Sequence, residues 1–184
     1  MKKEDLLLVI DMQNVYKKGG KWACLNTEGV ADKINKIIDS GMQNVIFTRF
    51  IANEKNPIGV WANYNKKYQE VNHNQYANMM VDELKEQIKK YPLYTKEFYS
   101  SLTIPQVLQA AKKAKRVVIT GVIAECCVLS TVFELIDHGI YTIYLTNGVS
   151  GLDRPKEEAT ELILSGLSPL HLEMMTVEEY INEK

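Results

Sequence analysis

Apolar residues along this chain gather in short runs that alternate with stretches of helical periodicity. Residues 6–11 form an apolar run that ends in a carboxylate, as expected for a strand buried on both faces. The next stretch opens on Thr27, a possible N-cap, carries its apolar residues on one helical face and ends near Gly41. Residues 45–48 follow at once and read as a second strand.

The same alternation returns in the second half of the chain. Two more strands are predicted at 116–120 and 141–145, and two helices at 126–138 and 155–165, each followed by a glycine. Shorter elements complete the pattern, namely a helix at 82–90, a strand at 94–96, a helix starting at Pro105 and a closing helix at 176–183, capped by Thr176 with Glu179. Because strands that alternate with helices need crossover connections, we expect a mainly parallel sheet in an α/β fold.

Residues 51–80 interrupt this pattern, since they are rich in Asn and Tyr and show no clear periodicity. A stretch of this length is too long for an ordinary connection, which favours a lid, an oligomer contact or an active-site loop. We call it the insertion. No repeat, low-complexity tract or linker divides the chain, so residues 1–184 are predicted to form a single domain that contains the insertion.

The composition narrows the classes of function. The 184 residues carry 22 basic and 23 acidic side chains, with a net charge of -1 and no long run of either sign, so we expect no nucleic-acid partner. The apolar run at the N-terminus is too short for a signal peptide or a membrane span, which predicts a cytoplasmic protein without a membrane partner. Cys24, Cys126 and Cys127 make an odd count and are expected to be reduced thiols.

Cysteine chemistry is the first candidate for function. The segment from Gly121 to Val128 joins a predicted strand to the start of a helix. A thiol in a first helical turn faces unpaired backbone N–H groups and the positive end of the helix dipole, which favour the thiolate. The same N–H groups can hold an oxyanion. Cys126 and Cys127 can equally be small core hydrophobes.

Two charged residues make the catalytic interpretation stronger. Asp11 directly follows a buried strand, and the carboxyl ends of parallel strands are where α/β proteins bind ligands, although a structural cap would also explain it. Lys96 ends a short strand, and a lysine between a carboxylate and a thiolate would stabilise both charges. Taken alone, a lysine here is more often a solvated surface charge.

Three motifs in this order resemble the isochorismatase-like cysteine hydrolases. The matching residues are Asp11 within Val-Ile-Asp-Met-Gln-Asn, Lys96 with Tyr99 and Ser100, and Gly121 with Cys127, Val128 and Thr131. The resemblance spans nearly the whole chain. It implies a three-layer α-β-α domain with a six-stranded, mainly parallel sheet in the Rossmann-like order 3-2-1-4-5-6, and a homo-oligomer, either a dimer or a tetramer.

The same resemblance implies the parts of an active site. Cys127 would be the nucleophile, with Asp11 and Lys96 completing a triad, and a non-proline cis peptide would fall at Val122–Ile123. The backbone N–H groups of Ile123 and Cys127 would form the oxyanion hole. The expected reaction is cleavage of a C–N bond in a small amide, carbamoyl compound or imide, through a thioester.

Two departures from the family limit what can be carried over. Nicotinamidases hold a metal with an Asp-x-His pair and a further His after the second strand, whereas this chain has no histidine between Thr48 and Glu54. His73 is an isolated histidine in the insertion, so we expect no metal and no other cofactor. The pair Ala124-Glu125 stands where the family commonly has Thr-Asp, so the substrate is left open.

Aromatic residues are the candidates for substrate contact. Those expected to line a mostly apolar pocket are Trp22, Trp61 and Tyr99, with Tyr64 near Trp61. Each can also be ordinary packing, and for Trp61 and Tyr64 an oligomer contact is an equal alternative. Arg49 is expected either to hold a substrate carboxylate or to pair with Glu125.

Two other functions stay open on the sequence. A thiol redox protein would use Cys126 and Cys127, but it gives Asp11 and Lys96 no shared role. A catalytically altered family member would bind a ligand without turning it over. A dinucleotide-binding protein is disfavoured, because no Gly-rich fingerprint follows the first strand.

Overall fold

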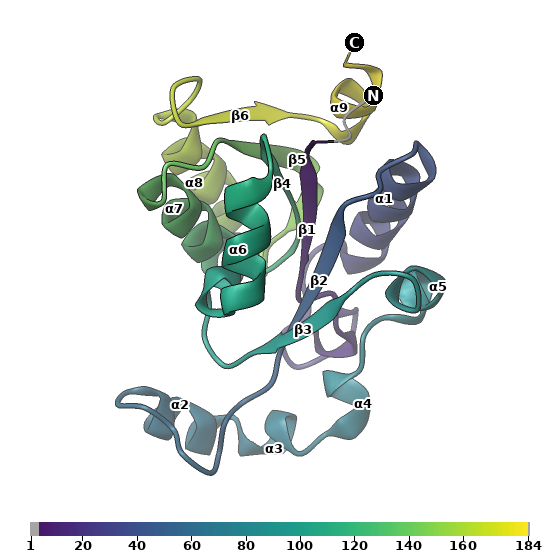
Figure 1. Ribbon diagram of the computed structural model, residues 1–184. Helices are drawn as coiled ribbons and strands as arrows, with labels where there is room; N and C mark the ends of the chain where they lie inside the picture. Colours follow the sequence, from purple (N-terminus) through teal and green to yellow (C-terminus); the bar gives the residue numbers. More distant parts are fainter. Residues whose placement is uncertain (1–3, 184) are drawn as a thin grey trace.

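The computed structural model describes residues 4–183, which form one parallel sheet between two layers of helices (Figure 1). Its strands are β1 (Leu6–Ile10), β2 (Val45–Phe50), β3 (Leu93–Lys96), β4 (Val117–Val122), β5 (Thr142–Ser150) and β6 (Leu172–Met175). Their order across the sheet is β3-β2-β1-β4-β5-β6, and every neighbouring pair is parallel. The predicted fold class and strand order are confirmed.

The helices include long elements that cover the faces of the sheet and short ones in the connections between strands. The α-helices are α1 (Thr27–Asp39), α2 (Trp61–Lys67), α3 (Gln69–Asn72), α4 (Gln75–Asn78), α5 (Lys85–Ile88), α6 (Pro105–Lys113), α7 (Leu129–Asp137), α8 (Arg154–Ser165) and α9 (Val177–Asn182). The 3₁₀ turns are η1 (Asn14–Tyr16), η2 (Asp82–Leu84) and η3 (Ser101–Thr103), and η4 (Ala124–Val128) is a π-helical turn. No helix within residues 4–183 is both long and apolar enough to cross a membrane.

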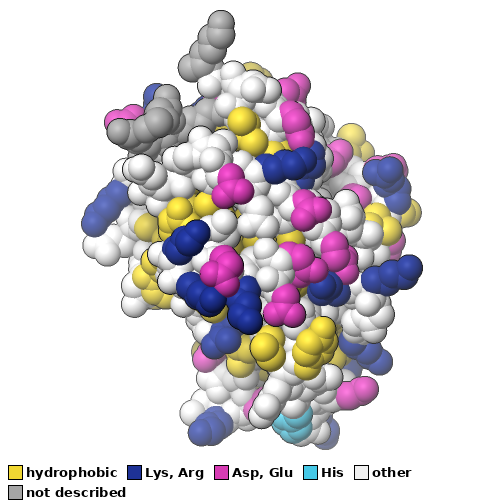
Figure 2. Space-filling view, turned by 90° about the vertical axis from the view of Figure 1, so that its right-hand side faces the viewer, with side chains coloured by type: hydrophobic (Ala, Val, Ile, Leu, Met, Phe, Trp, Pro, Cys, Tyr) yellow, Lys and Arg dark blue, Asp and Glu magenta, His cyan; other side chains and the backbone are white. Residues whose placement is uncertain are grey.

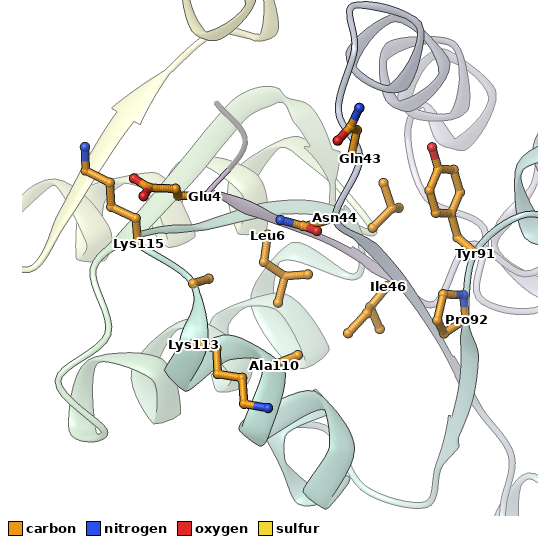
Figure 3. Close-up of a pocket in the computed structure, with 12 residues that line it drawn as sticks. Glu4, Leu6, Gln43, Asn44, Ile46, Tyr91, Pro92, Ala110, Lys113 and Lys115 are labelled. Atoms are coloured by element: carbon orange, nitrogen blue, oxygen red, sulfur yellow. The ribbon is translucent and has the colours of Figure 1, made fainter. Parts of the chain in front are cut away.

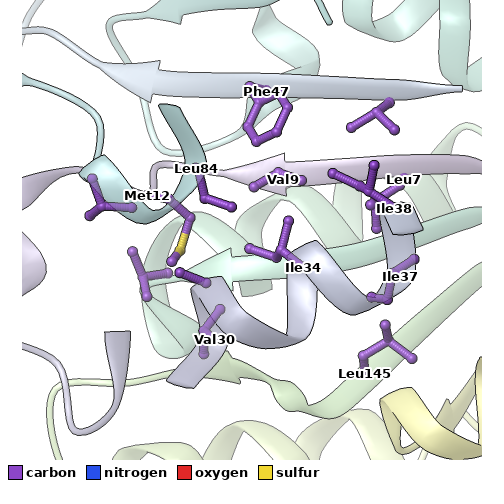
Figure 4. Packing of buried hydrophobic residues seen from close by; sticks show 14 of the residues in the cluster. Leu7, Val9, Met12, Val30, Ile34, Ile37, Ile38, Phe47, Leu84 and Leu145 are labelled. Carbon is purple, nitrogen blue, oxygen red and sulfur yellow. The ribbon is translucent and has the colours of Figure 1, made fainter. Parts of the chain in front are cut away.

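Alternate residues of the central strand β1 feed two separate hydrophobic cores. Leu7 and Val9 pack with α1 and α9, as the cluster in Figure 4 shows for Leu7, Val9 and Ile34. Leu6, Leu8 and Ile10 point to the other face, where α6, α7 and α8 cover the sheet. Both faces of β1 are therefore buried, which explains why its sequence is uniformly apolar.

Helix boundaries follow the predicted caps with one correction. The N-cap of α1 is Asn26, whose side chain accepts from the Gly29 N–H, while the Thr27 hydroxyl donates to the carbonyl of Tyr16 at 2.6 Å. Pro105 opens α6 and the Thr176–Glu179 capping box opens α9, as predicted.

The insertion is more regular than its sequence suggests. It contains α2, α3 and α4, which lie together below the sheet in Figure 1. Its asparagines serve the backbone: Asn65, Asn72 and Asn78 donate to insertion carbonyls, and Asn74 caps α4. The sequence predicted a loop because the residues that make these hydrogen bonds are not spaced with a helical period.

The second half differs from prediction in two elements. Strand β5 runs to Ser150 rather than to residue 145, since the half-buried Thr146 and Asn147 break its apolar run without ending the strand. The helix predicted at 126–138 is split into the π-helical turn η4 and α7. A π-helical turn of this kind widens the backbone at the point where a strand passes into a helix.

Gly121 lets β1 and β4 approach closely at their carboxyl ends. It pairs with Ile10, adopts a φ of 112°, and would place a Cβ atom 2.1 Å from the carbonyl oxygen of Ile10. Only glycine fits that position without moving the backbone. Just beyond this close approach, β1 continues into Asp11 and β4 continues into η4.

A Gly121→Ala substitution should therefore destabilise the protein beyond the cost of its φ angle. Gly41 is the matched control, because its φ is 104° but no atom lies within 4 Å of its Cβ position. We expect the free energy of unfolding to fall by about 2 kcal/mol more for Gly121→Ala than for Gly41→Ala, measured by urea unfolding. Equal losses in the two variants would contradict the close approach.

Candidate active site

Three strand ends supply the charged and reactive groups of the site. Asp11 directly follows β1, Lys96 is the last residue of β3, and Cys127 lies in η4 after β4. Strands β1 and β4 flank the point where the strand order reverses, which is the usual place for a ligand crevice in such sheets. Lys96 lies two strands away and reaches the others through its long side chain.

The three side chains meet in the interior of the protein. The Lys96 Nζ lies 2.6 Å from Asp11 Oδ2 and 3.3 Å from the Cys127 Sγ. Asp11 is 0%, Lys96 2% and Cys127 4% exposed, so the ion pair is shielded from water. The structure thus brings together the three residues that the sequence analysis singled out.

Lys96 is held charged by its surroundings. Its ammonium also donates to the carbonyls of Phe98 at 3.0 Å and Tyr99 at 2.8 Å. Burial lowers the pKa of Lys96, but the contacts of its ammonium with Asp11 and Cys127 outweigh this effect and leave the pKa raised. The ammonium is therefore a permanent positive charge beside the sulfur.

The resting state of Cys127 differs from the sequence-based expectation of a thiolate. Burial raises the pKa of this thiol well above its ordinary value, the nearby Lys96 lowers it, and Asp11 raises it again. Burial outweighs the helix dipole because almost no water reaches the sulfur. Cys127 is thus a thiol at rest, and ionising it requires a proton acceptor.

Asp11 is fixed in an orientation suited to accept that proton. It adopts a φ of 53°, an uncommon conformation for a residue other than glycine. Its backbone N–H donates to the Thr48 carbonyl at 3.0 Å, and the Thr48 hydroxyl donates to Oδ1 at 3.1 Å. These contacts hold the carboxylate at the bottom of the site.

The backbone before Cys127 has one feature that the resemblance implied. The Val122–Ile123 peptide bond is cis. The N–H groups of Cys126 and Val128 both donate to the carbonyl of Ile123, each at 3.1 Å, so these two donors are already used.

A cavity of about 170 Å³ opens onto the thiol. Six aromatic side chains form most of its wall, namely Tyr16, Trp22, Phe50, Tyr64, Tyr68 and Tyr99. The remaining lining residues are Ile123, Cys126, Cys127 and Leu152. None of the lining residues is a Lys, Arg, His, Asp or Glu.

The candidate aromatic residues lie at different places relative to the cavity. Trp22 and Tyr99 line the cavity, but Trp61 does not; its ring packs behind the wall, 4.9 Å from Tyr99 and 5.1 Å from Tyr64 between ring centroids. The cavity is also lined by four residues that were not predicted from the sequence, namely Tyr16, Phe50, Tyr68 and Leu152. Tyr64 and Tyr68 are four residues apart along α2 and the turn after it, a helical spacing that places both on one face.

Two other candidates lie outside the cavity. Arg49 does not pair with Glu125; it donates to the Thr95 hydroxyl at 3.0 Å, and Glu125 accepts from the Leu152 N–H at 3.3 Å instead. His73 lies on the insertion surface, where its Nε2 is 2.6 Å from Glu54 Oε2.

The residues of the site do not suit a metal ion. Within the described part of the chain, no three His, Cys, Asp or Glu side chains gather closely enough to hold one. The only such residues that line the cavity are two cysteines, and the rest of the wall is aromatic or aliphatic.

A larger cavity, of about 820 Å³, lies at the opposite edge of the sheet (Figure 3). It is lined by Leu6, Val45 and Ile46 at the starts of β1 and β2, together with Tyr91, Pro92 and Ala110. Its charged groups are Glu4, Lys113 and Lys115. The smaller cavity is the candidate site because Cys127 lines it.

The exterior gives no sign of a continuous charged surface on the face shown in Figure 2. Acidic and basic side chains are interspersed there, with a histidine near the lower end.

Comparisons with known proteins place this geometry in a family. The Isochorismatase domain model matches residues 5–179. No curated protein matches the chain by sequence.

Solved structures share the fold at low sequence identity. A cysteine hydrolase from Pseudomonas syringae pv. phaseolicola is 18% identical, with a TM-score of 0.79 over 97% of this chain and 91% of that one. Pyrazinamidase of Pyrococcus horikoshii, in complex with zinc, is 20% identical, with a TM-score of 0.72 over 94% of this chain and 99% of that one. The MAR1 ribonuclease from Caenorhabditis elegans is 19% identical, with a TM-score of 0.73 over 98% of this chain and 80% of that one.

These structural likenesses show the fold alone, since each identity is low. The family model, by contrast, covers both strands that flank the reversal point and all three residues of the buried triad. The protein belongs to the isochorismatase-like hydrolase family.

Proposed function

We propose that the protein is a cysteine-dependent amidase that cleaves a C–N bond of a small, uncharged amide through a thioester on Cys127. The observation that carries the proposal is the position of the Lys96 ammonium, 2.6 Å from the Asp11 carboxylate and 3.3 Å from the Cys127 sulfur, beside a cavity. A carboxylate, an ammonium and a thiol in mutual contact supply a base, a fixed charge and a nucleophile.

The first step is proton transfer from Cys127 to Asp11. Before transfer the triad holds one positive and one negative charge, and after transfer it still does, because the negative charge moves from oxygen to sulfur. No net charge is created in the buried site, which avoids the cost of ionising an isolated thiol there. Lys96 contacts both positions of that negative charge.

The thiolate then adds to the amide carbonyl carbon. The negative charge that develops on the carbonyl oxygen is stabilised by the backbone N–H groups of Ile123 and Cys127. Asp11 gives its proton to the leaving nitrogen, the C–N bond breaks, and a thioester remains on Cys127.

Water completes the cycle. Asp11, again a carboxylate, takes a proton from a water molecule that attacks the thioester carbonyl. The tetrahedral intermediate collapses to a carboxylic acid, and the sulfur leaves as thiolate and recovers its proton from Asp11.

Cavity size and wall chemistry support a small neutral substrate. About 170 Å³ is below the range typical of drug-sized ligands and equals about six liquid waters. Lys96 is already paired, and the lining residues include no other cation that would balance a substrate carboxylate. The phosphodiester of an RNA would meet the same lack of positive charge, so a ribonuclease activity is not favoured.

A thiol redox function is also not favoured. Cys126 lines the cavity, but burial and the Glu125 carboxylate both raise the pKa of its thiol. A second thiol that resists ionisation is a poor partner for reversible oxidation.

Cys127→Ala should abolish amide hydrolysis, lowering kcat by at least about 1,000-fold, since the nucleophile is removed. Cys126→Ala is the matched control, because it removes the neighbouring thiol of the same turn and should keep most of the activity. Ammonia release from a panel of small amides measures both. Equal activity of Cys127→Ala and wild type would reject the mechanism.

Substrate charge should decide turnover more strongly than substrate shape. For a pair of planar carboxamides that differ only in a carboxylate substituent, we expect kcat/KM to be about 100-fold higher for the neutral compound, because an unpaired anion is costly in an apolar pocket. Ammonia release at fixed ionic strength provides the ratio. A preference for the anionic member would show that the cavity holds a cation not accounted for.

A further inference from the structure

Two buried hydroxyl groups that do not line the cavity lie next to Asp11. Thr48, near the end of β2, is 0% exposed and donates its hydroxyl proton to Asp11 Oδ1 at 3.1 Å. The Ser101 hydroxyl, also 0% exposed, lies 3.2 Å from the Thr48 hydroxyl oxygen.

The direction of these hydrogen bonds follows from counting protons. A carboxylate oxygen can only accept, so the single hydroxyl proton of Thr48 points to Asp11. Ser101 must then donate to Thr48. The two hydroxyls thus form a one-way chain that ends on the carboxylate, and each donor strengthens the next.

The two hydroxyl-bearing residues are also connected to Cys127 by hydrogen bonds. The Ser101 backbone N–H donates to the Thr131 hydroxyl oxygen at 3.0 Å, and the Thr131 hydroxyl donates to the Cys127 carbonyl at 2.7 Å. Base and nucleophile are therefore connected by a second route, through β2, η3 and α7, that does not pass through Lys96.

We propose that Thr48, supported by Ser101, is a positioning residue that orients the Asp11 carboxylate to accept the proton of Cys127. A donor aimed at a carboxylate favours the ionised form, which is the form that accepts the proton of Cys127. This inference rests on the proposed amidase mechanism and adds to it the Thr48 hydroxyl, which holds the Asp11 carboxylate in position.

Shape alone does not require a hydroxyl at position 48. Valine has nearly the same outline as threonine, so a purely packing role would survive Thr48→Val. Thr120 on β4 offers the matched control: it is also 0% exposed, and its hydroxyl reaches only the Leu8 carbonyl, at 3.5 Å. Both sites are central-sheet threonines, but only one contacts the triad.

The test compares the acid limb of activity in wild type, Thr48→Val, Thr48→Ser and Thr120→Val. Without the hydroxyl, the Asp11 carboxylate loses a donor that holds it in place, so the acid limb of activity should move to higher pH and kcat should fall about tenfold. Thr48→Ser keeps a hydroxyl and should restore both values, and Thr120→Val should match wild type. The titratable groups that interact with Asp11, namely Lys96, Cys127 and Tyr16, are present in every variant.

A second readout does not depend on a substrate. The rate of Cys127 alkylation by iodoacetamide, followed by mass spectrometry across pH, reports the same proton acceptor, and its acid limb should shift upward in Thr48→Val as well. If wild type hydrolyses no amide but this shift appears, the amidase proposal fails and the role of Thr48 stands. If Thr48→Val and Thr120→Val give the same acid limb as wild type, the role of Thr48 is refuted.

Ser101→Ala keeps the test decisive if Thr48→Val does not fold. It removes the donor behind Thr48 and should shift the acid limb of alkylation in the same direction by a smaller amount. If Thr48→Val does not fold and a folded Ser101→Ala protein shows no shift, the proposed role of the two hydroxyls is refuted.

Discussion

The buried contact between Asp11, Lys96 and Cys127 is the interaction on which the rest of this structure depends. An isolated carboxylate or ammonium at 0% to 2% exposure would cost several kcal/mol, so each of these charges is tolerable only because the other is present. Burial holds the sulfur protonated, and the fixed ammonium beside it makes ionisation possible once Asp11 takes the proton. Burial and charge balance together explain how a thiol with a raised pKa would act as the nucleophile of the proposed reaction.

The fold provides this contact by bringing together the ends of strands that are far apart in sequence. Parallel strands end at one edge, and the reversal of strand order between β1 and β4 opens that edge. Gly121 allows β1 and β4 to approach closely. The carbonyls of Phe98 and Tyr99 accept hydrogen bonds from Lys96. The Thr48 hydroxyl, which contacts that of Ser101, donates to the Asp11 carboxylate. Aromatic rings from the insertion and from the loop after β1 then close the cavity over the sulfur.

Local sequence patterns predicted the sheet, whereas the meeting of Asp11, Lys96 and Cys127 was predicted with the help of the family resemblance. The apolar run before Asp11 and the strand-to-helix passage at Cys127 are visible without a structure, and the parallel topology places their ends together. Contacts between residues that are far apart in the sequence could not be predicted. Nothing in the sequence around Thr48 indicates that its hydroxyl meets Asp11, and Trp61 was misplaced because the path of the insertion decides which of its rings faces the cavity. The state of the Cys127 thiol also needed coordinates, since burial outweighs the helix dipole that the sequence suggested.

The most direct test of the central claim is the alkylation rate of Cys127 in Lys96→Met at pH 8, with Cys126 of the same molecule as internal reference. Removing an ammonium 3.3 Å from the sulfur should lower the Cys127 rate more than about tenfold. The Cys126 rate should fall much less, because burial and Glu125 affect the pKa of that thiol more than Lys96 does. A Cys127 rate equal to that of wild type in a folded Lys96→Met protein would contradict the account, because the sulfur would then ionise without the charge that is said to make this possible.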